Sequence, residues 1–156
     1  MNSQTHIRLA DPDDGERLRE IARSAKGHWG YEPGKVRAWA DTLDFSPERL
    51  RARLVLVAES EGAPVAWASA VDSGEIWWLD DLWVEPSGMD RGIGARLFER
   101  IAEHARAAGA SRLEWEAERN ALGFYEKMGG RYLRDAASSS WGPANTVMAL
   151  ELNRLG

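Results

Sequence analysis

Apolar residues recur along this chain with two different periods, and the period predicts which segments form helices and which form strands. The ends of the helical segments carry matching signals: Asp11 precedes Pro12 at the first start, and Gly109 follows the longest helix. Spacings of three and four residues predict helices over 12–25, 33–42, 92–108 and 121–128, with a further helix start at 46–50.

Short apolar runs and runs of alternating polarity lie between these helices and predict strands. The alternation is disturbed at 79–82, where Asp80 and Asp81 stand together, and this predicts a β-bulge. Because strands and helices interleave, we expect an α/β (α+β) fold in which helices pack on both faces of a mixed sheet. The predicted strands cover residues 7–10, 54–58, 65–71, 75–84, 111–118, 131–135 and 146–152.

The composition fits one globular domain over residues 1–156. The chain is 44% hydrophobic, which supplies a core, and neither an internal repeat nor a linker divides it. Apolar runs stay strand-sized and the first nine residues are polar, so we expect neither a membrane-spanning helix nor a secretion signal. The net charge of −5 argues against a nucleic-acid partner.

Several kinds of site are excluded by residue type. The chain has no cysteine, which rules out disulfides, zinc–thiolate sites and a cysteine nucleophile, and a reducing cytoplasm is the expected location. The three histidines, His6, His28 and His104, show no metal-ligand spacing, so we expect no metal.

Tryptophan is unusually frequent, with eight residues in the chain. Most are expected to pack in the core, but some are expected to line a pocket, because a rigid apolar ring with one N–H suits a ligand wall. The sequence does not separate the two groups, which are drawn from Trp29, Trp39, Trp67, Trp77, Trp78, Trp83, Trp115 and Trp141.

The segment that says most about chemistry follows the fourth predicted strand. Residues 82–97 read Leu-Trp-Val-Glu-Pro-Ser-Gly-Met-Asp-Arg-Gly-Ile-Gly-Ala-Arg-Leu, so a strand, a loop and a helix opening on Gly-x-Gly follow one another. The first N–H groups of a helix lack intrahelical partners and lie at the positive end of its dipole, so glycines there let a pyrophosphate approach. Arg91 and Arg96 can add charge-assisted contacts.

Taken alone, this motif also fits a tight turn into a helix that binds nothing. A Rossmann site is disfavoured because Leu97 stands where its third glycine belongs, and the Gly-Lys-Ser or Gly-Lys-Thr of a P-loop is absent. A second segment, residues 120–130, reads Asn-Ala-Leu-Gly-Phe-Tyr-Glu-Lys-Met-Gly-Gly. By itself it is an amphipathic helix with a glycine stop.

In this order and at this spacing, the two segments resemble the GNAT superfamily of N-acetyltransferases. The resemblance covers about residues 7–152 and is strongest over 79–130. Residues 27–31, Gly-His-Trp-Gly-Tyr, are also similar to one group of bacterial-type members. The resemblance implies a mostly antiparallel GNAT sheet and transfer of an acetyl group from acetyl-CoA to an amine.

The resemblance also implies roles for individual residues. Asn120 is expected to bond the cofactor arm near the thioester, and Tyr125 to protonate the departing thiolate. The family usually has Gln or Arg where this chain has Met89, so either the site is weakened or Arg91 supplies the charge. The backbone of Leu82, Trp83 and Val84 is expected to hold the pantetheine arm, and the turn Arg91, Gly92, Ile93, Gly94 and Ala95 the pyrophosphate.

Aminolysis of a thioester needs a neutral amine and therefore a base. An alkyl amine with a pKa of about 10.4 is neutral in roughly one molecule in a thousand at pH 7, and a positioned carboxylate raises that fraction. Glu116, whose register matches the family's usual catalytic glutamate, is the expected base. Glu114, Asp80 and Asp81 are alternatives, and all four also fit solvated surface carboxylates.

The acceptor is expected to be a cationic amine, because acids gather near the expected pocket. His28, Trp29 and Tyr31, between the first two predicted helices, are expected to form part of its wall. The sequence specifies neither the acceptor nor the acyl-chain preference, and a homodimer is compatible with it. Two other functions fit the chain: a non-catalytic acyl-CoA-binding module, and a protein-interaction domain that presents its tryptophans to a partner.

Overall fold

One seven-stranded sheet runs through the computed structural model, which describes residues 5–137, 141 and 145–152. The spatial order is β1-β2-β3-β4-β5-β7-β6. Every neighbouring pair is antiparallel except β4 and β5, which confirms the mixed, mostly antiparallel sheet. The strands are β1 (Thr5–Leu9), β2 (Leu54–Ser60), β3 (Ala63–Asp72), β4 (Ile76–Val84), β5 (Arg112–Ala117), β6 (Arg131–Asp135) and β7 (Thr146–Glu151).

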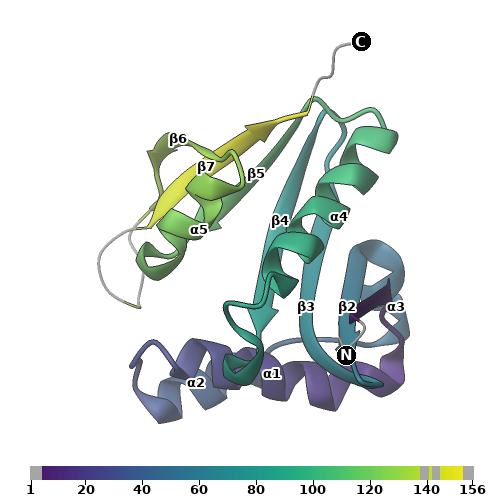
Figure 1. The fold of residues 1–156 in the computed structure, drawn as a ribbon, viewed down its shortest axis with the longest axis vertical. Helices are drawn as coiled ribbons and strands as arrows, with labels where there is room; N and C mark the ends of the chain where they lie inside the picture. Colours follow the sequence, from purple (N-terminus) through teal and green to yellow (C-terminus); the bar gives the residue numbers. More distant parts are fainter. Residues whose placement is uncertain (1–4, 138–140, 142–144, 153–156) are drawn as a thin grey trace.

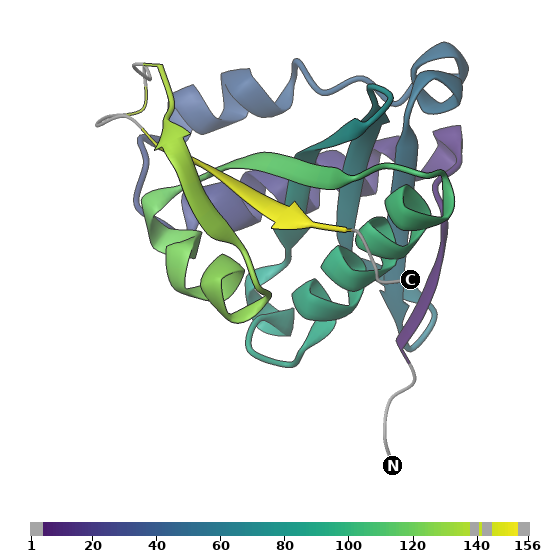
Figure 2. The ribbon, with the colours of Figure 1, turned by 90° about the horizontal axis from the view of Figure 1, so that it is seen from above.

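Helices cover both faces of this sheet, as predicted (Figure 1 and Figure 2). Seen from above in Figure 2, α1 and α2 lie on one side of the sheet and α4 and α5 on the other. The helices are α1 (Gly15–Gly27), α2 (Pro33–Ala40), α3 (Pro47–Ala52), α4 (Ile93–Ala107) and α5 (Leu122–Lys127).

The helix starts follow the local signals. The Asp11 carboxylate accepts a hydrogen bond from the Asp13 N–H and caps a short 3₁₀ turn that leads into α1. The Ser46 hydroxyl accepts from the Arg49 N–H at the start of α3. Gly109, with φ +90°, follows α4.

A separate hydrophobic core fills each side of the sheet. On the α4 side, Phe98 packs edge-on against Trp115 of β5 with ring centroids 5.1 Å apart. On the α1 side, Trp67 of β3 is buried against Leu18, and its indole N–H donates to the Leu18 carbonyl oxygen at 2.8 Å. The sheet is therefore anchored on both faces.

The β-bulge predicted in β4 is confirmed. Opposite β3, Ser69 pairs with Asp81 and Ala70 pairs with Leu79, so Asp80 is the extra residue. The insertion changes which residues face which helix layer: Leu79 packs with the α4 core, whereas Trp83 packs with the α1 core.

Among the described residues, no helix is long and apolar enough to cross a membrane. The same residues contain no cluster of three or more acidic or histidine side chains able to hold a metal ion. The predicted loop over 136–145 lies partly outside the described residues.

Candidate functional site

The one parallel pair of strands in the described part of the chain, β4 and β5, is also the place where the sheet opens. β4 and β5 pair over residues Ile76 to Leu79 and Arg112 to Trp115 and no further, while β4 continues along β3 and β5 along β7. Figure 1 shows the two strands diverging from that point. The last paired residue, Leu79, directly precedes the bulged Asp80, and a bulge bends the strand that carries it. We call this divergence the split.

The split leaves one edge of β4 unpaired by its neighbour. The Glu85 N–H donates to the Val65 carbonyl at 2.9 Å, and opposed residues in an antiparallel ladder alternate between bonded and non-bonded pairs. With the observed register, Trp83 bonds to β3, and the N–H and C=O groups of Leu82 and Val84 point toward the split. Such an edge can accept an extended chain as an added strand.

Helix α4 begins beside this edge on the turn that the sequence singled out. Gly92 is its N-cap residue with φ +80°, and no side chain caps the first N–H groups. A Cβ added at Gly92 would meet nothing within 4 Å, so this side of the turn is open. At Gly94 a Cβ would lie 3.4 Å from Val84 Cγ2, which places the turn against β4.

The two arginines of this turn differ in their surroundings. Arg96 is exposed, and its guanidinium donates to the Thr5 carbonyl of β1 at 3.1 Å. Arg91 is also exposed and lies directly before the N-cap glycine. Arg91 is therefore the better placed of the two to supply charge at the turn.

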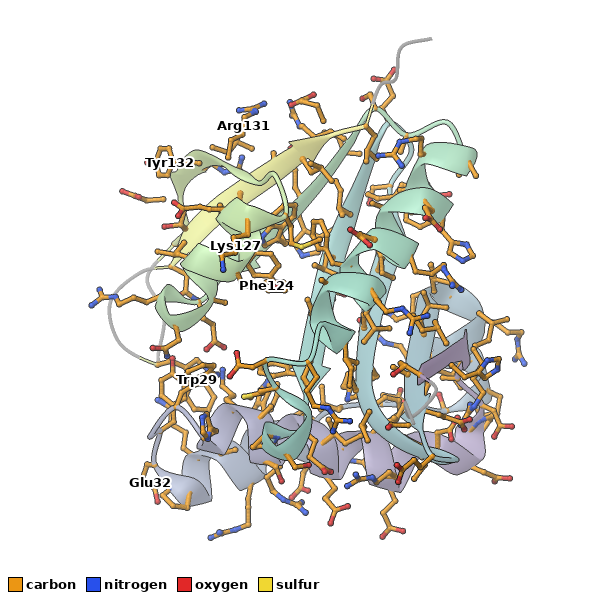
Figure 3. The ribbon with its side chains drawn as sticks, in the orientation of Figure 1. Trp29, Glu32, Phe124, Lys127, Arg131 and Tyr132 are labelled. Atoms are coloured by element: carbon orange, nitrogen blue, oxygen red, sulfur yellow. The ribbon has the colours of Figure 1, made fainter. Side chains whose placement is uncertain are left out.

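Tyr125 comes from α5, across the split from β4. The residue is 8% exposed, and its ring packs 5.0 Å from Trp115 and 5.0 Å from Phe124. Figure 3 shows Phe124 on the side of α5 that is turned to α4. Burial raises the pKa of the Tyr125 phenol, and the negative charges of Glu118 and Asp81 raise it further. Among the described residues, its hydroxyl has no hydrogen-bond partner.

Asn120, predicted to contact the cofactor arm, lies in a single 3₁₀ turn between β5 and α5. It is exposed, as is the preceding residue Arg119. It therefore lies at the end of the split where β5 gives way to α5.

Asp81, on β4, is a largely buried carboxylate. Burial raises its pKa, although hydrogen bonds from the Ser69 hydroxyl at 2.7 Å and the Trp83 indole N–H at 3.0 Å oppose this effect. It borders a pocket of about 170 Å³ on the α1 side of the sheet. Its neighbour Asp80 is exposed and ion-paired with Arg53.

The acidic residues of β5 do not form one solvated row. Glu114 is buried at 6% exposure, and its carboxylate accepts from Arg112 Nε at 2.9 Å, so the surface position considered for it is wrong. Glu116 is exposed and accepts from the Asn145 side-chain amide at 2.9 Å. No shared partner joins the two carboxylates, although both lie on one face of the strand.

Glu118, which the sequence reading left without a role, lies just after β5. Its carboxylate binds the Lys26 ammonium at 2.8 Å and lies 3.4 Å from the Tyr31 hydroxyl, which donates to it. Its charge also acts on Tyr125. Lys26 and Glu118 are 92 positions apart in the chain, so local sequence gives no signal for the pair.

The predicted acceptor-wall residues separate into two groups. Tyr31 is half-buried and contacts Trp141 from the segment between β6 and β7, with ring centroids 5.1 Å apart. His28 and Trp29 are exposed and stack edge-on against each other at 5.2 Å. Figure 3 shows Trp29 on the side of the α1–α2 layer that is turned to α5, and Glu32 on the outer side.

Comparison with known proteins identifies relatives of this chain. A model of the acetyltransferase (GNAT) family matches residues 16–130. A rice protein, serotonin N-acetyltransferase 2, chloroplastic, is 36% identical over 75 residues, which span 46% of this chain and 36% of that protein. Rice glucosamine 6-phosphate N-acetyltransferase 1 is 29% identical over 140 residues, which span 74% of this chain and 82% of that protein.

Solved structures match nearly the whole chain. A GCN5-related N-acetyltransferase from Rhodopseudomonas palustris has a TM-score of 0.80 and 28% identity, covering 97% of this chain and 99% of that one. PaiA N-acetyltransferase from Thermoplasma acidophilum, in complex with coenzyme A, has a TM-score of 0.81 and 18% identity, covering 95% and 99%. Both share the fold described above.

Proposed function

We propose, from the premise that this chain belongs to the acetyltransferase (GNAT) family, that it transfers the acetyl group of acetyl-CoA to an amine in a ternary complex. The observation that carries the proposal is the position of the split. It places the free backbone edge of Leu82 and Val84 next to the open glycine turn of α4. The backbone edge suits an extended amide-bearing arm, and the glycine turn suits an anion.

The residues fit acetyl-CoA at both ends. Arg91, Gly92, Ile93, Gly94 and Ala95 would hold the pyrophosphate, since the open side of Gly92 leaves room for close approach to the first-turn N–H groups. The pantetheine arm would lie along the edge of β4, with Asn120 bonding it near the thioester. When bound, acetyl-CoA supplies the activated acyl group.

The remaining chemistry is proton transfer and charge stabilisation. The amine nitrogen would bond to the acyl carbon and give up a proton to a carboxylate, and the carbon–sulfur bond would then break to release the CoA thiolate. The Tyr125 phenol, which is protonated at neutral pH and whose pKa burial raises further, would donate to the thiolate. Backbone N–H groups at the β4 edge would stabilise the oxyanion.

Four carboxylates are candidates for the general base that takes the proton of the amine. Glu116 remains our prediction from register. Asp81 has the stronger physical case, because burial raises its pKa toward the range useful for a base and its charge is felt by Tyr125. We keep Asp80 and Glu114 as weaker alternatives, since Arg53 and Arg112 already neutralise them.

Titration calorimetry with acetyl-CoA tests the proposal. We expect micromolar binding by the wild type and loss of binding in Gly92→Glu, which puts a negative charge on the open side of the turn. A panel of amines assayed by free thiol release would then identify acceptors. Absence of acetyl-CoA binding by the folded wild type would contradict the proposal and favour the protein-interaction alternative.

The cellular setting is also a proposal. We keep a cytoplasmic location, which rests on the absence of cysteine, and a possible homodimer. Gel filtration with light scattering would decide the oligomeric state.

A further inference from the structure

A cluster of aromatic rings surrounds a single buried ammonium group next to the split. Lys26, in the last turn of α1, is 5% exposed. Its nitrogen lies between 4.2 and 5.5 Å from the centroids of four rings and 2.8 Å from the Glu118 carboxylate. The four rings belong to Tyr31, Trp39, Trp83 and Trp141, and with Glu118 they form what we call the box.

The box is assembled from separate parts of the chain. Trp39 comes from α2, Trp83 from β4, Tyr31 from the segment between α1 and α2, and Trp141 from the segment between β6 and β7. The rings also brace one another edge-on, with Trp39 and Trp83 centroids 5.1 Å apart and Tyr31 and Trp141 centroids 5.1 Å apart. The ring positions are therefore set by ring–ring contacts as well as by Lys26.

Several rings and one carboxylate around a cation form the arrangement that proteins use to bind alkylammonium ligands. A structural role alone explains it poorly, because an apolar side chain would fill the same space without removing a charge from water. Lysine is also a displaceable occupant, since its ammonium sits on a flexible four-carbon stem. Directly after it, α1 ends at Gly27, and Gly27 to Gly30 are exposed.

The box lies where an acceptor would have to arrive. Trp83 belongs to the part of β4 that borders the split, and the Trp83 indole also donates to Asp81. Glu118 follows the last residue of β5, and its charge reaches Tyr125. The side chains of Trp83 and Asp81 lie on the α1 side of the sheet, the side opposite to α4.

We propose that the box receives the amine acceptor in its ammonium form, before a carboxylate removes the proton that the nitrogen must lose to attack, and that Lys26 occupies the box when no acceptor is present. The substrate class is then a primary alkylammonium compound, recognised by ring faces and one carboxylate. This inference rests on the proposed function only in identifying the ligand as the acceptor of the acetyl group. The binding of an ammonium compound to the box does not depend on the proposed function.

Tetramethylammonium chloride is the probe, with tert-butanol as its neutral counterpart of similar shape and sodium chloride as the salt control. Tryptophan fluorescence reports binding because three tryptophans line the box. The test variant is Lys26→Ala, which removes the Lys26 ammonium and leaves that of Lys35, whose nitrogen lies 4.6 Å from the Trp141 ring centroid. The matched control is Lys26→Met, which fills the space of the Lys26 side chain with an uncharged chain. If Lys26 fills the box for about nine-tenths of the time, its removal lowers the apparent Kd about tenfold.

We expect Lys26→Ala to bind tetramethylammonium about tenfold more tightly than the wild type, Lys26→Met to gain nothing, and tert-butanol to bind neither variant. Equal affinity of Lys26→Ala and wild type, or equal binding of tert-butanol, would overturn the proposal. If Lys26→Ala does not fold, the wild type still decides. The probe should expose Lys26 to an amine-reactive reagent while the labelling rate of Lys127 stays constant, and an unchanged Lys26 rate would overturn the proposal.

The two proposals fail separately. Gly92→Glu should lose acetyl-CoA binding and keep tetramethylammonium binding. If the wild type binds tetramethylammonium but not acetyl-CoA, the acetyltransferase function fails and the ammonium site stands. If acetyl-CoA binds and Lys26→Ala shows no gain, only the box is refuted.

Discussion

Replacing Gly92 by alanine separates the cost of its backbone conformation from its contribution to ligand binding. Gly92 has φ +80°, and a Cβ there meets no atom within 4 Å. The substitution therefore causes no clash in the free protein and costs only the left-handed strain, about 1–2 kcal/mol. For a chain of this size the expected fall in Tm is about 2–8 °C.

The same helix supplies a matched control at its other end. Gly109 has φ +90°, and a Cβ there also meets nothing within 4 Å. Gly109→Ala should lose the same stability as Gly92→Ala in thermal and urea unfolding. Only Gly92→Ala should weaken acetyl-CoA binding, because its methyl group enters the space assigned to the pyrophosphate. Loss of one charge-assisted hydrogen bond, about 1.5–3 kcal/mol, raises Kd about ten- to hundredfold.

Titration calorimetry on both variants and the wild type provides the measurement, at a temperature well below all three Tm values. The reasoning is refuted if the two variants bind acetyl-CoA equally well. Their backbone strain is the same, and only Gly92→Ala places a methyl group in the space assigned to the pyrophosphate. Equal weakening in both would show that affinity follows stability and not the position of the methyl group.

Three further outcomes follow from the site. Gly94→Ala should leave stability unchanged or raise it by up to about 1 kcal/mol, since its Cβ makes ordinary contact with Val84. The same substitution should raise the Kd for acetyl-CoA, and an unchanged Kd would show that Gly94 does not contact the pyrophosphate. Tyr125→Phe should keep acetyl-CoA binding and lower kcat about 10²- to 10⁴-fold, measured by thiol release; full turnover would exclude Tyr125 as the acid. Asp81→Asn should stabilise the protein near pH 7. In the folded protein the pKa of Asp81 is raised, so the wild type loses stability as the pH rises through that pKa. Urea unfolding between pH 4 and 7 should therefore show that Asp81→Asn is more stable than the wild type, and that this difference disappears in acid.

Local patterns in the sequence were sufficient to predict the helices, the strands and the glycine turn that opens α4. Helix starts at Asp11 and Ser46 and the bulge at Asp80 were all predictable, because caps and broken alternation act within a few residues. Two neighbouring signals also located the turn at Gly92, namely the end of a strand and the opening of a helix.

The acidic and aromatic part of the site was not predictable in the same way. Glu118 and Glu114 belong to one alternating run, yet Glu114 is buried against Arg112 whereas Glu118 reaches Lys26 on α1. Which of several equivalent acids meets a partner is decided by strand order and by loops far away in the chain. The same holds for the tryptophans, whose spacing does not show that Trp39, Trp83 and Trp141 meet around one nitrogen.

The extra residue at Asp80 determines which way the side chains and the backbone groups of β4 point after Leu79. Without it, the faces after Leu79 would be exchanged, and the Asp81 carboxylate would enter the α4 core. Burying a carboxylate there without a partner costs several kcal/mol, so the bulge is the lower-energy register. With it, Asp81 and Trp83 face the α1 side, where the box lies, while the free edge of Leu82 and Val84 borders the split. With the roles proposed above, a single insertion in β4 places side chains for the acceptor and backbone groups for acetyl-CoA on neighbouring residues, as direct transfer between two bound substrates requires.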